Sequence, residues 1–534
     1  MRRVLNEMDI IFYNGLIRTM HGTQAVSALG VENGIIRAVG NDKEVLAQKS
    51  AHTMLVDLHG KLMLPGFNDS HLHILSYGLN KRRLNLVGCC SVPEIIKRGH
   101  KLIEENIHSG LIIGRGWNQD IFQYPDFPDK HDLDEISSEL PVILYRVCGH
   151  IAVINSKAFE FFGITPHTHC KAGGSFDFAS GLFRETALDL LNIAKPDKNE
   201  LKDIIKDAAT DMLRYGITSA QSDDFGFAPY DDIINTYSEL AATGELPLRI
   251  YQQCLFDKYD DIDLFLAKQH QVPSHQAFYQ LGPIKLLCDG SLGARTAYLS
   301  QPYQDDPNTQ GIPCFSQTEL DNIVSLCQQN GKATAIHCIG DGAAYRALQA
   351  IEKAQKAYGT NLRHGLVHCQ ITDEAILAKM PELGLSAYIQ PIFLDYDIHI
   401  VNERVGTKLA GTSYQFKTLN ELGVHISLGS DCPVEPFNPF PNIYCAVTRQ
   451  DLAGYPPGGY NPGQALSVQE AVYAYTAGSA YCSSEENIKG QLKEGYYADM
   501  AVIDRDIFDI KPSEIKDARV VMTIVGGEIV YGGV

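Results

Sequence analysis

The sequence predicts an α/β protein with a parallel sheet or barrel at its centre and a small β domain at its ends. Three observations support this prediction. The middle of the chain alternates short apolar strands with helical stretches, the order typical of parallel sheets and barrels. Both ends of the chain are rich in short strands and turns. One connection in the middle is far too long for a single βα unit.

The two ends of the 534-residue chain are predicted to form one composite β domain. Asn33-Gly34 lies between two apolar segments of residues 25–40, which indicates a two-residue hairpin. Residues 498–504 and 519–531 have the same character, and the second run contains a turn at Gly526-Gly527. We therefore assign residues 1–62 and 485–534 to this domain.

Eight strand candidates predict a second domain at residues 63–484. Amphipathic stretches such as Leu201–Tyr215 and Glu319–Asn330 separate them, and from the fourth strand onward the spacing fits βα units. The candidates are residues 62–64 leading into 69–73, 217–221, 248–254, 284–288, 333–338, 365–369, 385–390 and 425–430.

The first connection of this domain does not fit the pattern. More than 140 residues separate His73 from Ile217, far beyond a single βα connection. We predict an inserted subdomain at about residues 80–200, and we expect it to cover the barrel mouth as a lid.

Composition and charge narrow the function classes. The chain has 20% charged and 45% hydrophobic residues, which is normal for a globular enzyme. A formal net charge of −19 without clustered Lys and Arg argues against nucleic acid and anionic membrane as partners. We find no run of about 18 apolar residues, no signal peptide, and no CxxC pair among the 13 cysteines. We therefore expect a cytoplasmic protein with free thiols.

Two histidines follow the first strand candidate in the segment Asp69-Ser70-His71-Leu72-His73. Positions i and i+2 of a strand share a face, so both imidazoles can point toward the barrel axis and bind one divalent metal. Two surface histidines would look the same. The position at the carboxyl end of a barrel strand favours the metal site, because active sites lie on that face.

Lys285 lies among apolar residues on the fourth strand candidate. Lysine is almost never fully buried without a partner, and burial lowers its pKa. The resulting neutral amine can react with CO2 to give a carbamate, a two-oxygen anion able to bridge two metals. A lysine at a strand end that reaches solvent is an equal alternative.

Three further candidates each end a separate predicted strand. His337 ends the fifth strand, His368 the sixth and Asp431 the eighth. A single histidine at a strand end is more often structural than a metal ligand. Three such residues together with the histidine pair and an embedded lysine favour a metal site.

In the order of these residues the chain resembles the amidohydrolase superfamily. Its flanking segments resemble the large branch that includes the N-substituted formamide deformylases (amidohydrolase family 3). The resemblance runs nearly end to end. The segments that carry it are Leu64–His73, Asp289–Ala297, Ile336–Asp341, Gly429–Glu435, Ala498-Asp499 and Thr523–Gly527.

The resemblance implies a (β/α)8 TIM-like barrel, a β-sandwich formed by both termini, and one or two divalent metal ions, usually zinc. The implied ligands are His71, His73 and Asp431 for one ion, His337 and His368 for the other, and a carboxylated Lys285 as the bridge.

One ligand has an alternative. Where relatives often have Arg-Ile-Glu-His, this chain has Gly365-Leu366-Val367-His368, so His364 also comes into question. Both histidines would face the same side of the strand. We choose His368 because it lies nearer the carboxyl end.

Such a site predicts a metal-dependent hydrolase that cleaves a C–N bond of a linear amide, N-acyl or N-formyl compound. Metal ions lower the pKa of bound water towards ~7 and stabilise the oxyanion. Asp431 can take the hydroxide proton and deliver it to the leaving nitrogen. A deaminase or lactonase on the same site, or a non-catalytic regulatory protein of the same fold, is an alternative.

Three residues are candidates for substrate contacts. Trp117 and His150 lie in the predicted insertion, and Arg295 follows a glycine-rich loop after the fourth strand. Each has a structural alternative, which is core packing for Trp117, helix capping for His150 and a surface ion pair for Arg295. We expect a small-molecule substrate and leave a homodimer open.

Overall fold

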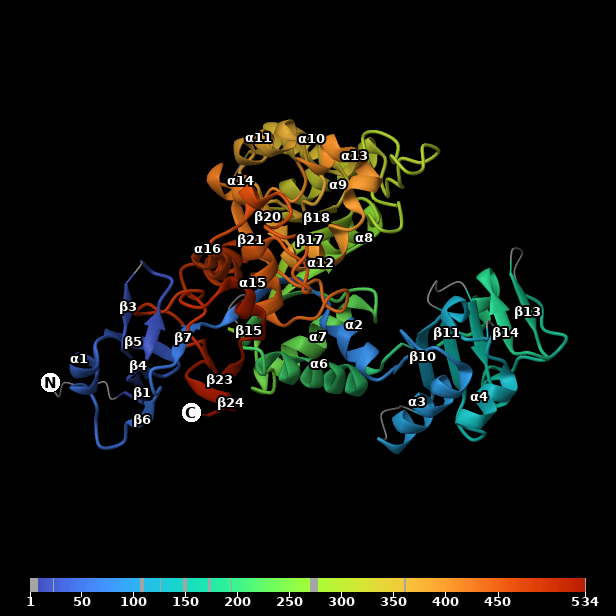
Figure 1. Ribbon diagram of the computed structural model, residues 1–534, viewed down its shortest axis with the longest axis horizontal. Coiled ribbons are helices and arrows are strands. Elements are labelled where there is room, and N and C mark those ends of the chain that lie inside the picture. The colour runs from blue at the N-terminus through green and yellow to red at the C-terminus, as the bar shows by residue number, and fades with distance from the viewer. Residues whose placement is uncertain are drawn as a thin grey trace. The chain divides into compact units, whose positions relative to one another are not determined.

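The computed structural model describes residues 8–22, 24–105, 110–124, 126–146, 151–170, 174–193, 195–268, 277–359 and 362–533. The chain divides into two compact units (Figure 1). One unit comprises Met1–Ile74 and Lys198–Val534, and the other comprises Leu75–Asp197.

The larger unit contains a (β/α)8 TIM-like barrel, as predicted. Its eight strands form one parallel sheet in the order β21-β20-β19-β18-β17-β16-β15-β8. The strands are β8 (Phe67–Leu72), β15 (Ile217–Asp223), β16 (Arg249–Leu255), β17 (Tyr279–Leu287), β18 (Thr334–Cys338), β19 (Gly365–His368), β20 (Ser386–Ile389) and β21 (His425–Leu428).

Hydrogen bonds draw the two end strands of this sheet together. The backbone N–H of Asp431, just after β21, donates to the carbonyl of His71 in β8 at 2.7 Å. The buried carboxylate of Asp69 accepts the backbone N–H of Ser430 at 3.1 Å. A side chain on Gly429 would meet the His71 backbone nitrogen at 2.7 Å, so this position requires glycine for the close approach. The seam therefore lies beside the predicted metal ligands.

Helices alternate with the barrel strands. In α9, for example, Ser316 and Glu319 form a capping box, and Leu320, Ile323 and Val324 are buried at helical spacing. Helix α2 (Ile74–Lys81) begins at the last residue of the first segment of this unit and continues into the smaller unit. The helices that follow in the larger unit are α6 (Lys198–Leu213), α7 (Tyr230–Ala242), α8 (Tyr259–Ala267), α9 (Gln317–Gln329), α10 (Asp341–Tyr358), α11 (Glu374–Glu382), α12 (Leu394–Asp397), α13 (Val401–Ala410), α14 (Phe416–Glu421), α15 (Pro439–Thr448), α16 (Val468–Tyr473) and α17 (Ser479–Cys482).

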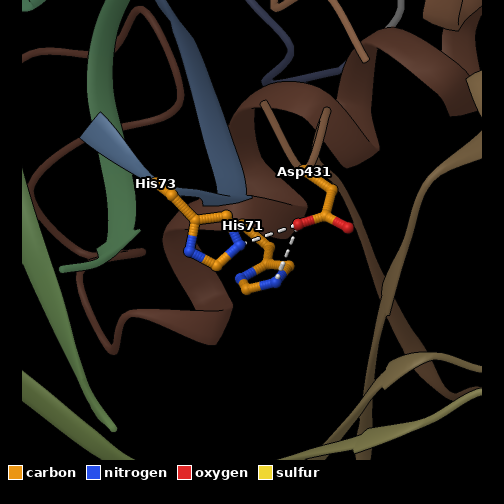
Figure 2. Close-up of side chains that lie close together, drawn as sticks. All are labelled: His71, His73 and Asp431. Carbon is orange, nitrogen blue, oxygen red and sulfur yellow. Dashed lines mark hydrogen bonds and ion pairs between the residues drawn. The ribbon is translucent and has the colours of Figure 1, made fainter. Parts of the chain in front are cut away.

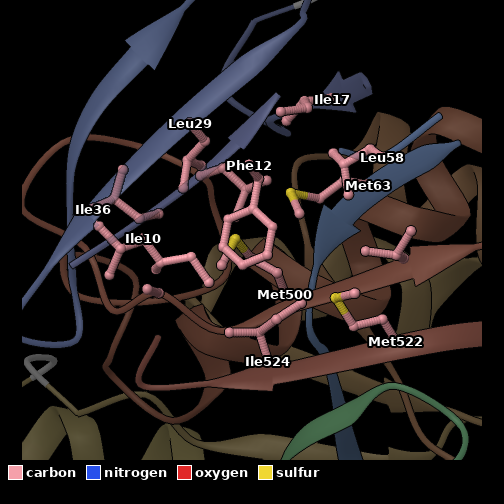
Figure 3. Close-up of a cluster of buried hydrophobic side chains, with 14 of the residues drawn as sticks. Ile10, Phe12, Ile17, Leu29, Ile36, Leu58, Met63, Met500, Met522 and Ile524 are labelled. Carbon is pink, nitrogen blue, oxygen red and sulfur yellow. The ribbon is translucent and has the colours of Figure 1, made fainter. Parts of the chain in front are cut away.

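The chain ends form two further sheets: β5-β4-β1-β6 comes from the N-terminal end alone, and β24-β23-β22-β7-β2-β3 combines both ends. Apolar side chains of the two sheets form a common core that includes Phe12, Leu29, Met500 and Ile524 (Figure 3). The elements are β1 (Ile10–Tyr13), β2 (Leu16–Arg18), β3 (Ala25–Val26), β4 (Ala28–Glu32), β5 (Ile35–Gly40), α1 (Asp42–Leu46), β6 (Met54–Asp57), β7 (Leu62–Pro65), β22 (Met500–Ile503), β23 (Val520–Val525) and β24 (Glu528–Gly532).

The two predicted turns are confirmed. Asn33 and Gly34 both have positive φ, at 51° and 73°, and join the antiparallel strands β4 and β5. Gly526 and Gly527 also have positive φ and join β23 to β24.

One predicted strand is wrong. Residues 62–64 belong to β7, which pairs with β2 and β22 of the terminal sheet rather than with a barrel strand. The first barrel strand is β8, one element later. The chain passes between the sheets at Gly66, where an added side chain would meet the Thr218 hydroxyl oxygen at 2.1 Å.

The smaller unit has its own sheet and core. Its strands are ordered β13-β14-β12-β11-β10-β9. Whether this unit covers the barrel mouth stays a prediction. Its elements are β9 (Leu84–Asn85), α3 (Val92–Glu104), β10 (Ile112–Trp117), α4 (Lys130–Ile136), β11 (Val142–Arg146), β12 (Ile151–Ile154), α5 (Ser156–Phe162), β13 (Ser175–Asp177) and β14 (Leu182–Arg184). Across the described residues of both units, the helices are all too short or too polar to cross a membrane.

Candidate metal centre

Three of the predicted ligands converge at the barrel seam. His71 and His73 come from the carboxyl end of β8, and Asp431 follows β21 (Figure 2). The Nε2 atoms of His71 and His73 lie 3.3 and 3.0 Å from Oδ1 of Asp431. One donor atom from each residue lies within 4.8 Å of the others, which is the spacing of ligands around one metal ion.

Hydrogen bonds on the far side of each imidazole determine which nitrogen carries the proton. Nδ1 of His71 lies 2.8 Å from the Gln253 amide oxygen, and the Gln253 amide is oriented by donating to the β8 backbone. Nδ1 of His73 lies 2.9 Å from the backbone carbonyl of Asp223. Both contacts are with acceptors, so in each neutral imidazole Nδ1 is the donor and Nε2 keeps its lone pair. Burial lowers the pKa of His73, but the hydrogen bond to Asp431 and the charge of that carboxylate outweigh burial and raise the pKa to about 9, so Nε2 of His73 shares a proton with Asp431. A cation in place of that proton would meet two imidazole nitrogens and a carboxylate oxygen at one point.

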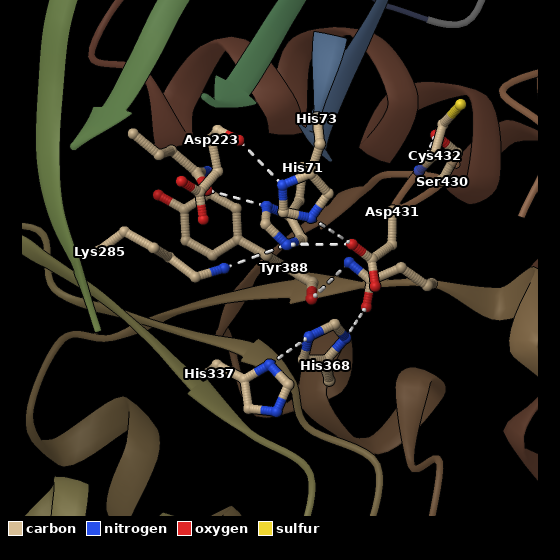
Figure 4. Close-up of polar contacts among 12 residues, drawn as sticks. His71, His73, Asp223, Lys285, His337, His368, Tyr388, Ser430, Asp431 and Cys432 are labelled. Carbon is tan, nitrogen blue, oxygen red and sulfur yellow. Dashed lines mark hydrogen bonds and ion pairs between the residues drawn. The ribbon is translucent and has the colours of Figure 1, made fainter. Parts of the chain in front are cut away.

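A second pair of imidazoles shows the same arrangement (Figure 4). Nδ1 of His337 and Nε2 of His368 are 2.9 Å apart. The other nitrogen of His368 faces the Gln390 amide oxygen at 2.8 Å, and the other nitrogen of His337 faces the Gly290 carbonyl at 3.1 Å. The two facing nitrogens are thus both acceptors when the rings are neutral. Burial lowers the pKa of His368 well below its ordinary value, which favours the neutral ring.

Lys285 lies between these groups on β17 and is fully buried. Its Nζ lies 3.0 Å from Nε2 of His71. Burial lowers the pKa of the Lys285 amine, although the nearby carboxylates of Asp223 and Asp431 oppose the shift. The rings of His71 and His368 are 5.7 Å apart, so the six predicted residues form one cluster.

Asp431 stays ionised in this cluster. Burial raises the pKa of its carboxyl, but the hydrogen bond from His73 and the neighbouring imidazoles outweigh burial and hold the pKa below its usual range. The backbone φ of Asp431 is +58° and that of His368 is +80°, an unfavourable conformation for residues other than glycine. Such strain is typical of functional sites, where the surrounding structure determines the geometry.

The alternative ligand His364 lies at the other end of β19. Its Nδ1 lies 2.8 Å from the Thr334 hydroxyl, and its Nε2 lies 2.6 Å from the Gln328 amide oxygen. Both nitrogens are therefore occupied by structural contacts. The choice of His368 agrees with the geometry.

Two of the predicted substrate-binding residues, Trp117 and Arg295, make structural contacts with other described residues. Trp117 is fully buried in the core of the smaller unit, where its indole N–H donates to the Leu144 carbonyl at 2.9 Å. Arg295 forms an ion pair with Asp305 at 2.7 Å. Both positions agree with the structural alternatives, and their roles in substrate binding stay predictions. His150 lies outside the described residues.

Sequence reasoning missed the residues that orient the ligands. Gln253 lies within β16 and Gln390 follows β20, and each contacts Nδ1 of a histidine. Asp69 accepts the backbone N–H groups of His71 and Ser430 and the Tyr475 hydroxyl, and burial raises its pKa to about 7. The available signal was a polar residue within or just after a predicted barrel strand.

Comparison with known proteins gives the family. A model of the amidohydrolase family matches residues 54–531. The chain is 32% identical to the Bacillus subtilis protein YtcJ over 98% of this chain and 99% of that protein. YtcJ is named as an amidohydrolase. The chain is 24% identical to the N-substituted formamide deformylase of Arthrobacter pascens over 98% of both chains. The crystal structure of an uncharacterized metal-dependent hydrolase from Pyrococcus furiosus matches 94% of this chain and 100% of its own, with a TM-score of 0.79 and 29% identity. This chain therefore belongs to the amidohydrolase family.

Proposed function

We propose that the protein is a metal-dependent hydrolase that cleaves the C–N bond of a linear amide, of the N-acyl or N-formyl type. The observation that carries this proposal is the convergence of Nε2 of His71, Nε2 of His73 and a carboxylate oxygen of Asp431 at one point, where a cation would bind. In the proposed centre, zinc or another divalent metal is held by His71, His73 and Asp431, and a second ion by His337 and His368.

Lys285 is proposed to complete the centre as a carbamate. In this reaction the neutral amine adds to the carbon of CO2 and loses one proton, so a C–N bond forms and the side chain becomes an anion. Burial favours the neutral amine that the reaction needs. An anion here also compensates the charge of two divalent ions, which a buried ammonium cannot do.

Asp431 is the proposed proton carrier. When bound, the metal ions supply an activated water at neutral pH and polarise the scissile carbonyl. The carboxylate of Asp431 accepts the proton from that water and donates it to the amide nitrogen, which must be protonated before it leaves. Its low pKa keeps it in the accepting form, and the imidazole of His73 at 3.0 Å orients the carboxylate.

One relative supports the proposed substrate class. The N-substituted formamide deformylase has a name that states a formamide substrate, and its similarity covers 98% of both chains. A deaminase or a lactonase on the same centre would differ in product, and a regulatory protein of the same fold would show no turnover.

The test combines metal analysis with a substrate panel. Elemental analysis of the purified protein should show at least one tightly held divalent ion. The metal-loaded protein should release amine from N-formyl or N-acyl compounds and should not open lactones faster. His71→Asn should lose metal and activity, whereas His59→Asn on an exposed turn serves as the matched control. Absence of bound metal, together with no activity after zinc or manganese is added, would refute the proposal.

A further inference from the structure

A cavity of about 220 Å³ lies at the carboxyl ends of five consecutive barrel strands, β17 to β21. Its apolar wall includes Leu292, Ile339, Phe393 and Val434, which follow four of these strands. In another protein an apolar cavity of about 150 Å³ binds benzene, so this volume accommodates a single ring with a short side chain.

The cavity adjoins the candidate metal centre. The ring of Phe393 stacks on the imidazole of His368, with centroids 5.8 Å apart and planes inclined by 14°. Glu435, another lining residue, follows Asp431 by four positions and interacts with it electrostatically. A substrate whose amide reaches the metal ligands can therefore place its adjacent substituent in this cavity.

A buried acceptor without a partner lines the same cavity. Gln370 is 3% exposed, and its Nε2 donates to Oδ2 of Asp397 at 2.6 Å and to the Tyr414 hydroxyl oxygen at 3.1 Å. These two contacts orient the amide, and its oxygen Oε1 has no hydrogen-bond partner among the described residues. A buried acceptor left without a donor costs free energy. The oxygen is itself enclosed, so a donor in the cavity reaches it only after the lining side chains shift.

The charges that line the cavity are all negative. Asp397 and Glu435 are its acidic residues, and the carboxylate of Glu435 has no ion pair or hydrogen bond within the described part of the chain. Arg295 and Arg404 both pair with Asp305 and are therefore compensated elsewhere. Burial raises the pKa of Glu435 to about 7, so the carboxyl is ionised in mildly alkaline solution.

We propose that this cavity binds the amine half of the substrate, and that it accepts an apolar substituent that is uncharged or cationic and rejects one that carries a carboxylate. The inference rests on the proposed function. The amine half is favoured because it carries an N–H donor, which matches the carboxylate of Glu435, whereas a formyl or simple alkanoyl half carries none. Glu435 is the specificity-determining residue, because like charges that face each other in a partly buried cavity repel strongly.

The experiment compares substrates that differ mainly in the charge of one substituent. N-formylphenylalaninamide and N-formylphenylalanine have the same ring and backbone, and N-formylphenethylamine lacks the carboxamide or carboxylate group beside the scissile amide. Each is assayed with the zinc-loaded enzyme at about pH 8.5, where a carboxyl of pKa about 7 is ionised. We expect the carboxylate compound to have a kcat/KM at least ~100-fold lower than the two uncharged compounds.

Two variants test whether Glu435 causes the difference in kcat/KM between uncharged and anionic substrates. Glu435→Gln should narrow this kcat/KM gap by at least ~10-fold, mainly by raising kcat/KM for the anionic substrate. The substitution removes the charge repulsion between the two carboxylates and keeps the shape of the side chain. Glu421→Gln, an exposed position on α14, should leave the gap unchanged. Equal kcat/KM for charged and uncharged substrates, or an unchanged gap in Glu435→Gln, would overturn the inference.

A binding measurement separates this inference from the proposed function. Calorimetry with phenethylamine and with phenylalanine, both without a scissile bond, should show at least ~10-fold tighter binding of phenethylamine, and Glu435→Gln should weaken this preference. If the enzyme hydrolyses none of the amides, the proposed function fails while calorimetry still decides the inference. Equal affinity for the two amines refutes it.

Discussion

Replacement of Asp431 by asparagine separates its two proposed roles. The Asp431 side chain is 10% exposed, and its Oδ1 lies 3.3 and 3.0 Å from Nε2 of His71 and His73. Asparagine has nearly the same shape and can place a carbonyl oxygen at the same point. It cannot take up a proton near neutral pH, so Asp431→Asn removes the proton acceptor while keeping a neutral ligand.

The size of each effect follows from the geometry. The two imidazoles remain oriented by Gln253 and by the Asp223 carbonyl, so the site keeps two of its three donors. Substitution of a residue that only hydrogen-bonds to a metal ligand lowers metal affinity by about 10–100-fold. For substitution of a ligand itself we expect at least that loss. Excess zinc can still fill the site. Loss of a general acid–base group lowers the rate by about 10²–10⁴-fold, and kcat at full metal loading should fall by at least that range.

The assay measures zinc content and kcat on the same sample. Asp203→Asn, an exposed position on the outer helix α6, is the control and should keep both values. Near-normal kcat at full zinc loading in Asp431→Asn would refute the reasoning, because another group would then move the proton. His150 would become the first residue to examine. A variant that binds no zinc at any concentration would instead show that the charge of Asp431 is essential for the site.

The remaining predictions concern the metal, the lysine and the stability of the fold. A chelator should lower the thermal unfolding midpoint, and zinc should restore it, because a ligand that binds the folded state stabilises it; no shift would contradict a tight site. Native mass spectrometry should show the added mass of CO2 on the wild-type protein, and Lys285→Met should lack it; equal masses after correction for the substitution would exclude a carbamate. Asp499 and Arg249 form a buried bidentate ion pair at 2.7 and 3.0 Å. Asp499→Ala leaves the Arg249 charge buried without its partner and should destabilise the larger unit by ~3–5 kcal/mol in chemical denaturation. Lys206→Ala, which breaks an exposed pair, is its control, and equal effects of the two changes would refute the argument. Phe12→Ala in the terminal core should cost ~3–5 kcal/mol in the same assay, and a loss below ~1 kcal/mol would mean that this core contributes little.

The barrel strands were predictable because each is a short apolar segment with a helix before and after it. Residues 217–221 and 425–430 coincide with β15 and β21 to within two residues at either end. The segment 62–64 has the same composition, and there the prediction was wrong. Its hydrogen-bond partners are β2 and β22, the latter more than 400 residues away, and local composition carries no information on such pairing.

The site was predictable in its residue types but not in its chemistry. The spacing of His71 and His73 places both on one face of a strand, and that rule depends only on local geometry. The tautomer of His71 depends on Gln253, which is 182 residues away in the chain, and that of His368 depends on Gln390 on the next strand. These contacts exist only after the barrel has formed.

By itself the sequence determined the alternation of strands and helices, the two glycine turns, and the strand ends at which the candidate ligands lie, because each depends on neighbouring residues. Only the tertiary structure decided that β7 pairs with the terminal sheet, that Trp117 is enclosed in a core, and that Nε2 of His71 and of His73 converge on Asp431. The physical reason is the same in each case. Pairing, enclosure and proton position depend on groups that are distant in sequence and meet only in the folded chain.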